Sequence, residues 1–308
     1  MTRARGDERG FALLAVLLVL GILGVLGAEF AYSMRLEASA VRGYKDGIIA
    51  GYLAEAGVAQ AAKEIIGDWA IVTADPEGEL SFFTRDRVLI PHPHRTEVPL
   101  GAGYFNYRLR DEEALLNVNT SQPGRVEALL EALGVQKVQR DQIIDSIQDW
   151  RDPNDEHRAN GAESEDYYLK LPVPYRARNA NLDSTAELLQ IRGITPELFY
   201  GADGRPGLRD VVTVRSVGQI NINTAGPVVL RGLGLSEAEI TTVLQTRRDT
   251  PYAIVPGPFA GRGLTVTTRT FRIQAEGIVN GRVAARLTAV IRRQGDGAVS
   301  ILEWSGVQ

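Results

Sequence analysis

The chain has 308 residues, and its composition is that of a folded protein with many turns: 44% hydrophobic and 23% charged residues, with 32 Gly and 14 Pro. Its 34 basic and 38 acidic residues give a net charge of −4, which excludes the overall basic field that attracts nucleic acid. The sequence contains no Cys, which excludes disulfides, thiolate zinc sites and Cys nucleophiles.

An apolar segment begins at Phe11, and no charged residue interrupts it before Glu29. Continued to Met34, the segment is long enough to cross a hydrocarbon core of about 30 Å as one helix. The residues before it include three arginines, Arg3, Arg5 and Arg9. Because basic flanks stay in the cytoplasm, we expect the N-terminus inside and the rest of the chain outside the membrane. A secretory signal cut near Ala28 is the alternative.

The junction of Gly10 and Phe11 places a Gly before an aromatic residue, on the polar side of the apolar segment. This junction resembles the class III leader of type IV pilins and pseudopilins, which a prepilin peptidase cuts after the Gly. The resemblance implies a leader of residues 1–10, methylation of Phe11, and an apolar helix that stays on the mature protein. Apolar residues continue at helical spacing from Ile48 to Ile66, which predicts that this stem runs on into the exported domain.

The stem is the surface that we expect to contact partner helices. Gly21, Gly24 and Gly27 place small residues three apart, which favours close approach of a neighbouring helix. General tolerance of Gly in membrane helices is the alternative explanation. The residues that we expect at this contact are Phe11, Leu14, Leu18, Gly21 and Gly24.

One position departs from the common pilin pattern. Most pilins and pseudopilins carry a Glu at the fifth mature position, and counting from Phe11 this position is Ala15. A carboxylate in lipid is costly unless it is paired, so a subunit with no neighbour above it has no use for one. In lacking this Glu the chain resembles the minor pseudopilin K family of type II secretion systems.

Alternating runs between Glu79 and Arg110 predict strands packed on the stem, and alternation returns from Thr265 with an Asn-Gly hairpin turn at Asn280. The residues between these strands are mainly helical in pattern. We therefore expect an α+β fold, in which an N-terminal transmembrane and amphipathic helix packs on a pilin-like antiparallel sheet with a large, mainly helical inserted domain. The expected divisions are a leader 1–10, a transmembrane helix 11–34, a first pilin-like part 35–114, the inserted helical domain 115–245, and last strands 246–308.

The inserted region repeats one pattern, which begins at Asn117 and again at Asn221. Each copy reads Asn-x-Asn-Thr, then Pro, then Leu-Gly and an apolar residue, and a weaker copy covers residues 179–194. We expect an extended segment, a capped helix and a Gly C-cap in each copy, so that each resembles a helix-hairpin-helix unit. The expected N-cap residues are Thr120, Ser184 and Thr224.

Helix-hairpin-helix units also bind DNA backbones, and Arg231, Arg247 and Arg248 lie in or beside the second copy. A membrane-anchored DNA-binding protein of competence type is therefore an alternative function. Acidic residues are mixed through the same helices, which favours helix punctuation alone as the explanation of the pattern.

Nine carboxylates are concentrated between Asp141 and Asp166. Asp149, Asp152 and Asp155 are spaced by three around Pro-Asn, which predicts a loop after a helix that ends near Trp150. Carboxylates this close repel one another unless a cation or Arg lies among them, and hard divalent cations bind several such oxygens. From the residues alone, calcium, magnesium and a solvated loop balanced by arginines all stay open.

The order of motifs in this region also resembles the minor pseudopilin K family, from Ile-x-Asp-Trp at 147–150 through Gly-Ala-Glu at 161–163 to the Leu-Asp-Ser run at 182–184. The resemblance extends from the leader to the last strands. It implies that the inserted domain binds calcium. The ligands that it implies are Asp149, Asp152, Asp155, Glu163 and Asp166, with Trp150, Tyr167 and Tyr168 packed around them.

No G-x-S-x-G or H-E-x-x-H motif is present, and with three His in the chain we expect no enzymatic activity. The family resemblance implies a mechanical role at the tip of a periplasmic pseudopilus. The implied partners are minor pseudopilins I and J, together with H, and the inner membrane of a bacterium, with no nucleic acid. A minor pilin of a type IV pilus is a further alternative.

Overall fold

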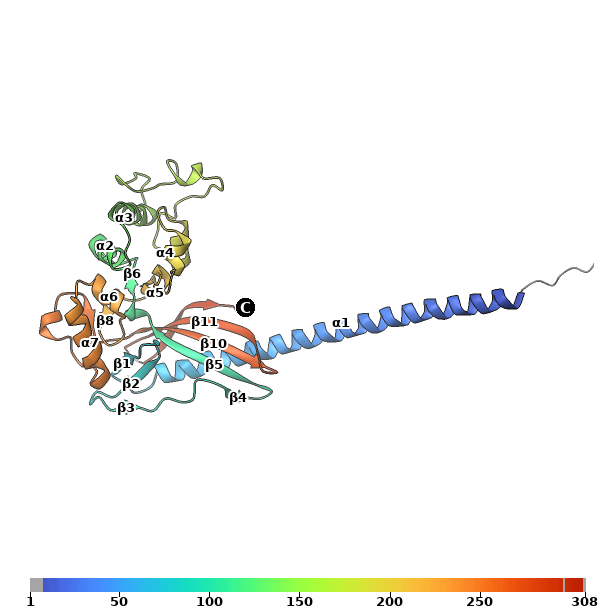
Figure 1. The fold of residues 1–308 in the computed structure, drawn as a ribbon. Coiled ribbons are helices and arrows are strands. Elements are labelled where there is room, and N and C mark those ends of the chain that lie inside the picture. The colour runs from blue at the N-terminus through green and yellow to red at the C-terminus, as the bar shows by residue number, and fades with distance from the viewer. Residues whose placement is uncertain (1–7, 296, 307–308) are drawn as a thin grey trace, which may run out of the picture.

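The computed structural model describes residues 8–295 and 297–306. Its longest element is α1, Glu8–Ile65, whose N-terminal part extends far from the body of the molecule as a free stem (Figure 1). The C-terminal part of α1 packs against β5, β10 and β11. The expected leader, residues 1–10, lies mostly outside the described residues.

The main sheet is antiparallel and has the strand order β12-β11-β10-β5-β4. A second, three-stranded sheet has the order β1-β2-β3. The bounds of these strands are β1 Ile71–Ala74, β2 Leu80–Phe83, β3 Leu89–Ile90, β4 Val98–Leu100, β5 Gly103–Asp111, β10 Thr270–Val279, β11 Arg282–Arg293 and β12 Val299–Ser305. The expected α+β fold class is confirmed, with a long apolar helix, antiparallel sheets and several helices.

The hairpin between β10 and β11 forms where the Asn-Gly pair predicts it. Asn280 and Gly281 both have positive φ, 53° and 72°, as a type I′ turn requires. The buried positions of β5 and β10 alternate along each strand, so one face of the sheet packs on α1.

The stem and the sheet approach each other very closely at Gly277 of β10. A Cβ added at this residue would lie 1.9 Å from the carbonyl oxygen of Ala50 in α1, so only glycine fits. At the end of α1, the carboxylate of Glu64 is buried beneath the sheet and receives the guanidinium of Arg95 at 2.7 Å and the hydroxyl of Tyr107. Apolar packing and one satisfied buried ion pair together fix the helix on the sheet.

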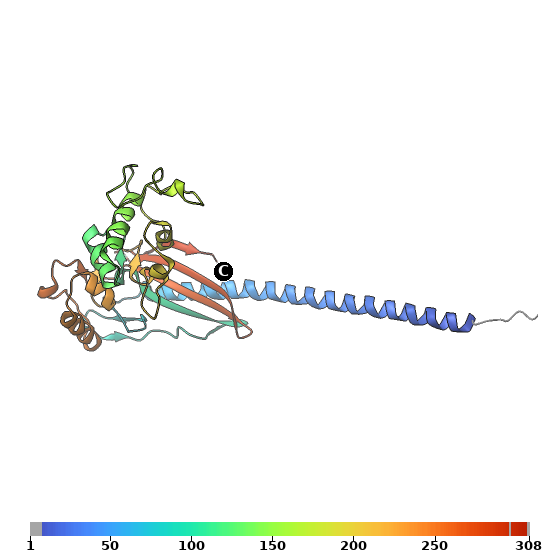
Figure 2. The same cartoon turned by 45° about the horizontal axis from the view of Figure 1, so that its top comes forward.

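The remaining helices lie in a segment that leaves the sheet and returns to it at the same end. Strand β5 ends at Asp111 and β10 begins at Thr270, and Asp111 pairs with Phe271 in the ladder. Residues 112–269, here called the helical region, therefore form an excursion between two neighbouring strands, and they rise from that end of the sheet (Figure 2). We call α1 from Ile48 onward and the two antiparallel sheets the sheet region.

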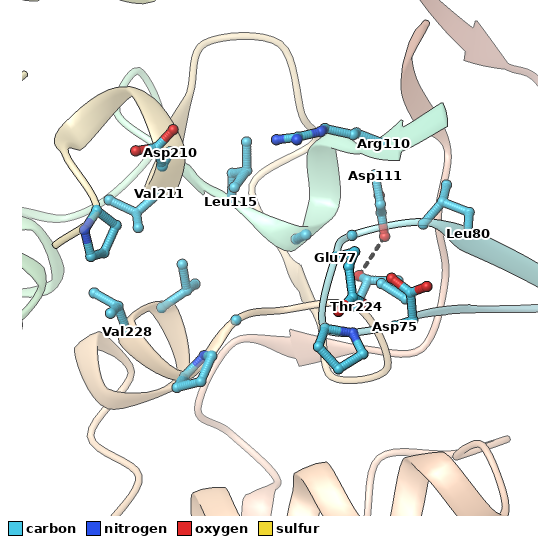
Figure 3. A pocket seen from close by; sticks show the side chains of 18 of the residues that line it. Asp75, Glu77, Leu80, Arg110, Asp111, Leu115, Asp210, Val211, Thr224 and Val228 are labelled. Carbon is cyan, nitrogen blue, oxygen red and sulfur yellow. Dashed lines mark hydrogen bonds between the residues drawn. The ribbon is translucent and has the colours of Figure 1, made fainter. Parts of the chain in front are cut away.

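Three consecutive carboxylates, Asp111, Glu112 and Glu113, bind the two ends of this excursion together, and all three are buried. Asp111 accepts hydrogen bonds from Thr224 (Figure 3), Thr268 and Asn221. Burial and the charge of Glu113 raise the pKa of Asp111 well above its usual value.

The neighbouring acids complete this junction. Glu112 accepts from Thr213 and from Arg272 Nε at 2.6 Å. Glu113 accepts from the backbone N–H groups of Arg269 and Thr270 at 2.9 and 2.8 Å. All three carboxylates thus bind the start of β10 or the residues just before it, at 268–272, and Asp111 and Glu112 also bind residues of the helical region.

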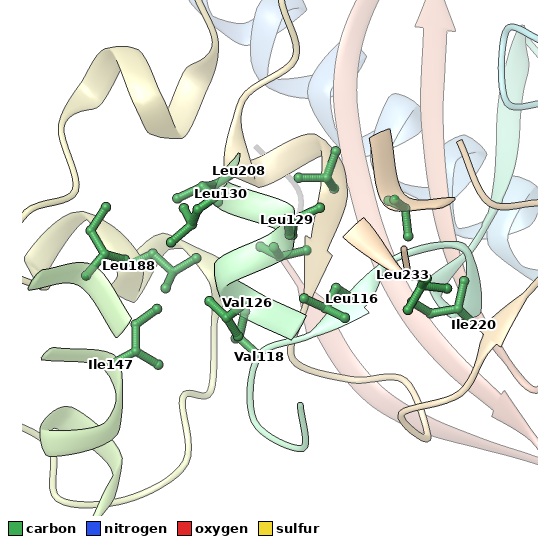
Figure 4. Close-up of a cluster of buried hydrophobic side chains, with 14 of the residues drawn as sticks. Leu116, Val118, Val126, Leu129, Leu130, Ile147, Leu188, Leu208, Ile220 and Leu233 are labelled. Carbon is green, nitrogen blue, oxygen red and sulfur yellow. The ribbon is translucent and has the colours of Figure 1, made fainter. Parts of the chain in front are cut away.

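The helical region consists of short helices and two-residue strands around its own apolar core (Figure 4). Gly232 lies against Leu129, where α2 and α6 meet. The bounds are η1 Glu112–Ala114, β6 Leu116–Asn117, α2 Pro123–Ala132, α3 Lys137–Arg151, η2 Tyr168–Lys170, η3 Thr185–Gln190, α4 Pro196–Tyr200, α5 Leu208–Val211, β7 Val212–Thr213, β8 Ile220–Asn221, α6 Pro227–Gly232, α7 Glu237–Asp249, η4 Gly257–Phe259 and β9 Leu264–Thr265.

The two predicted copies form the same unit twice, since a two-residue strand precedes a helix pair in each: β6, α2, α3 and β8, α6, α7. The Gly residues that end α2 and α6, Gly134 and Gly234, have positive φ, as expected of C-caps. The N-cap expectation is wrong at Thr120 and Thr224, because α2 and α6 begin later, after Gln122 and Gly226. Ser184 does cap a helix, with a full capping box, but that helix is the 3₁₀ turn η3.

Candidate functional site

The stem is an exposed apolar surface. Helix α1 contains a segment long and apolar enough to cross a membrane, and none of its most apolar part is buried in the molecule. Phe11, Leu14 and Leu18 are 76, 66 and 62% exposed, and a Cβ added at Gly21 or Gly24 would meet nothing within 4 Å. These residues are therefore available for contact with lipid or other helices, since no part of the chain between residues 11 and 295 covers them.

A groove of about 460 Å³ runs along α1 where the stem joins the sheet region. Its floor includes Gly43, Gly47 and Gly51, which are spaced by four residues, and Tyr44 and Tyr52 stand beside them. Sequence reasoning named the glycines of the apolar segment and missed this second series. The sequence pattern that predicts the groove is three glycines at i, i+4 and i+8, which lie on one face of a helix.

The expected processing residues Gly10 and Phe11 both lie within α1. The helix begins at Glu8 and continues through this junction without a break. Cleavage between the two residues stays a prediction.

In the acidic loop, the carboxylate of Asp149 lies at the end of α3 and is fully buried. It accepts from the backbone N–H of Arg158 and from Arg158 Nη1 at 2.6 Å. A Cβ added at Gly161 would lie 1.8 Å from Asp149 Oδ2, so this glycine gives the carboxylate its place. Loop backbone is therefore folded around Asp149.

Arg158 also binds Asp152, again at 2.6 Å, and thus bridges two of the five predicted ligands. The other predicted ligands are spread around this pair. Asp155 is exposed and accepts from Asn179, and Asp166 accepts from the backbone N–H of Glu163. Among the described residues, no three His, Asp or Glu side chains are placed closely enough to hold a metal ion.

Glu163 is the one predicted ligand whose own charge has no partner. Its side chain is 1% exposed, and neither carboxylate oxygen has a hydrogen bond among the described residues. Burial, and next the charge of Asp149, raise the pKa of Glu163 to about 7. An unpartnered buried carboxylate beside a second buried carboxylate is an arrangement that a bound cation stabilises.

The aromatic residues of the loop pack as expected. Trp150 and Tyr168 are buried with ring centroids 5.3 Å apart, and Tyr175 joins them. The guanidinium of Arg192 lies over Tyr167 at 4.6 Å and donates to the carbonyl of Gly161 at 3.0 Å. These contacts hold the acidic loop against α3 and Arg192.

The second Asn of each Asn-x-Asn-Thr copy makes the same contact. Asn119 accepts from the N–H of Leu182 and donates to its carbonyl, at 2.9 and 2.8 Å. Asn223 makes the same pair of bonds to Tyr252, both at 2.9 Å. Each amide therefore holds a distant backbone segment as a neighbouring strand would, and in the first unit that segment closes the acidic loop.

An arginine near the end of the last helix completes each unit. Arg151 donates to the carbonyls of Val118 and Asn119, and Arg247 donates to those of Ile222 and Ala225. Arg247 is buried against its own unit and Arg231 is paired with Glu237. Arg248 alone of the three is exposed without an acidic partner among the described residues, and one arginine does not form a basic surface. Nothing here supports the DNA-binding alternative.

Known proteins are similar to this chain in the region that contains the acidic loop. Residues 105–202 match the family model described as type II secretion system (T2SS), protein K. A type II secretion system protein K of Pectobacterium carotovorum is 38% identical over 90 residues, which cover 29% of this chain and 27% of that protein. A putative type II secretion system protein K of Escherichia coli K12 is 33% identical over 106 residues, or 30% of this chain and 32% of the relative.

The type II secretion system protein K of Aeromonas hydrophila is 29% identical over 119 residues, 33% of this chain and 36% of its own length. The chain thus matches about a third of the length of these relatives. The expected resemblance to protein K is confirmed. The fold is also similar to a chain of the GspK-GspI-GspJ complex from the type 2 secretion system of enterotoxigenic Escherichia coli, with TM-score 0.65 and 20% identity over 87% of this chain and 98% of that one.

Proposed function

We propose that this chain is a minor pseudopilin of a type II secretion system, which forms the tip of a periplasmic pseudopilus and supports protein export across the outer membrane. The observation that carries the proposal is the protein K match over residues 105–202, on a chain whose apolar stem is fully exposed. The stem anchors the protein in the bacterial inner membrane, with the N-terminus in the cytoplasm and the folded body in the periplasm.

The chain's role is to bind other subunits rather than to catalyse a reaction. The exposed face at Phe11, Leu14 and Leu18 and the groove at Gly47 both lie on α1 and favour packing against partner stems. Its partners are proteins that resemble minor pseudopilins I and J, together with H; the similar GspK chain comes from a complex of GspK, GspI and GspJ. The helical region is bulky and extends from one end of the sheet, which favours a place at the tip of a filament.

The acidic loop binds a calcium ion in this proposal. Asp149 and Glu163 are buried carboxylates, and Asp152, Asp155 and Asp166 lie in the same loop. When bound, the ion neutralises these charges and holds the loop in one conformation. In the structure, Arg158 binds an oxygen of Asp149 and an oxygen of Asp152. The ion and the guanidinium of Arg158 therefore compete for these oxygens.

The test of the proposed function is mass spectrometry of the mature N-terminus, from membranes of cells with and without prepilin peptidase. A chain that begins at methylated Phe11 only when the peptidase is present is the expected result. Intact Met1 or a cut near Ala28 would contradict the pseudopilin assignment. Co-purification with the I-like and J-like subunits, and its loss in Gly47→Leu but not in the exposed control Val138→Leu, then tests the partner surface.

A further inference from the structure

One guanidinium nitrogen in the acidic loop lies between two carboxylates. Arg158 Nη1 is 2.6 Å from Asp149 Oδ1 and 2.6 Å from Asp152 Oδ2. Asp149 is fully buried and the side chain of Asp152 is 20% exposed, so water screens these charges only weakly. A positive charge shared by oxygens of two acids takes the place of a bound cation in such a loop.

This single positive charge does not balance the acids near it. Glu163 is buried, and neither of its carboxylate oxygens has a hydrogen bond among the described residues. Burial raises the pKa of Glu163, and the charges of Asp149 and Asp152 raise it further, so Glu163 lies near the pair that Arg158 binds. Three carboxylates therefore lie near one guanidinium, and a negative charge is left over in a buried place. A divalent cation supplies the second positive charge that is missing.

The side chain of Arg158 is able to leave this position without unfolding the loop. It is 38% exposed, and its only side-chain hydrogen bonds to described residues are those to Asp149 and Asp152. The loop backbone is held separately, because the backbone N–H of Arg158 donates to Asp149 and the N–H of Gly161 donates to the carbonyl of Arg158. Movement of the guanidinium into water therefore breaks two contacts and keeps the backbone turn.

We propose that Arg158 is an internal competitor for calcium, which holds the acidic loop closed when calcium is absent and turns into solvent when calcium binds. Its departure frees oxygens of Asp149 and Asp152, and Glu163 gains the positive charge that Arg158 does not provide. This explains why no three described His, Asp or Glu side chains are placed to hold a metal ion while Arg158 is bound. The inference rests on the calcium site of the proposed function and adds what the loop does without calcium.

The test is isothermal titration calorimetry with calcium chloride, on the full chain in nanodiscs of phosphatidylcholine, a lipid without net charge. Arg158→Gln should bind calcium about tenfold more tightly than the unchanged chain, because calcium no longer has to displace a charged hydrogen-bond donor. In calcium-free buffer, the same variant should exchange the backbone hydrogens of residues 152–181 about tenfold faster, because the loop has lost the ion pair that closes it. Added calcium should reverse this faster exchange.

Arg176→Gln is the matched control, because it removes the same charge from the same loop. Arg176 pairs with Glu165, and the two side chains are 67 and 71% exposed. Exposed ion pairs contribute little to stability. The control should therefore bind calcium like the unchanged chain and exchange the hydrogens of residues 152–181 at the same rate.

The proposal is overturned if Arg158→Gln binds calcium no more tightly than the unchanged chain, which is the result expected of an arginine with a structural role alone. It is also overturned if Arg176→Gln gains as much affinity, because net charge alone then explains the gain. If none of the three chains binds calcium, the proposed calcium site fails together with this inference. The pseudopilin assignment is tested separately, by the processing of the N-terminus.

Discussion

In the sheet region, α1 packs on long antiparallel strands through a continuous set of buried apolar side chains, and few side-chain hydrogen bonds are needed. In the helical region, the helices α4, α5 and α6 have only 5, 4 and 6 residues, and the parallel pairings β6·β7 and β8·β9 have two residues each. Helices of that length are not stable alone. The region has an apolar core of its own, but polar side chains hold its segments in place.

The repeated polar contacts show how this is done. Asn119 and Asn223 each bond both backbone groups of a distant residue. Arg151 and Arg247 donate to carbonyls of the segment that precedes the first helix of their unit. Such bonds satisfy backbone groups that longer strands would otherwise pair. We therefore expect different substitutions to destabilise the two regions. Hydrogen exchange, measured segment by segment, shows which region has been destabilised.

The largest expected effect is in the sheet region. Ile273→Ala removes a fully buried side chain from β10 and should cost about 3 kcal/mol of unfolding free energy. Hydrogen exchange should accelerate in α1 after Ile48 and in β10 and β11. Val283→Ala, at a site 39% exposed on β11, is the control and should change little. Equal losses in the two variants would show that apolar burial does not dominate this region.

Calcium should stabilise the helical region and leave the sheet region unchanged. At a free calcium concentration of about 100 times the Kd, the ion should add about 2.7 kcal/mol. Addition of a calcium chelator should then accelerate exchange in residues 152–181. Asp149→Asn should remove this response, and Glu165→Gln, at a side chain 71% exposed, should keep it. A chelator response that is the same in the Asp149→Asn variant would contradict the proposed ligand.

The sequence predicted most of the sheet region, because its signals are local. The apolar run from Phe11, the alternation of β5 and β10 and the Asn-Gly turn at Asn280 each correspond to an observed element. In the helical region the Asn-x-Asn-Thr copies predicted the repeated unit. They did not predict its start, since the helices begin after Gln122 and Gly226 and the expected cap Thr224 instead donates to Asp111.

What could not be predicted depends on contacts across large sequence separations. The sequence did not single out Asp111, Glu112 and Glu113, because only the return of residues 213–270 buries them. Asn119 likewise bonds to a residue far along the chain, Leu182, which is 63 residues away. For the acidic loop, the sequence named the carboxylates, but the pairing of Asp149 with Arg158 and the isolation of Glu163 required the folded loop.

A smaller loss is expected when one amide of the helical region is removed. Asn223→Ala leaves the N–H and carbonyl of Tyr252 without their partner and should cost about 2 kcal/mol. Exchange should accelerate in the second unit, α6 and α7, and Asn119→Ala should do the same in the first. Thr241→Ala removes an exposed hydroxyl from α7 and serves as the control. If Asn223→Ala is no worse than this control, the amide contact does not stabilise the region.

The smallest expected effect is a change in pH dependence at the junction between the two regions. The raised pKa of Asp111 means that the folded state holds this proton more tightly than the unfolded state. Its contribution to stability is therefore complete below the usual value of 3.8 and decreases as the pH rises above it. Asp111→Asn keeps an oxygen that accepts from Thr224 and Thr268 and has no proton to lose. Its melting temperature, relative to that of the unchanged chain, should rise between pH 4.5 and pH 8. Thr241→Ala, which changes no ionisable group, is the control and should show no such trend. A difference that is constant with pH would mean that Asp111 is ionised in the folded junction, and that its four donors, including the backbone N–H of Glu113, outweigh burial and the charge of Glu113.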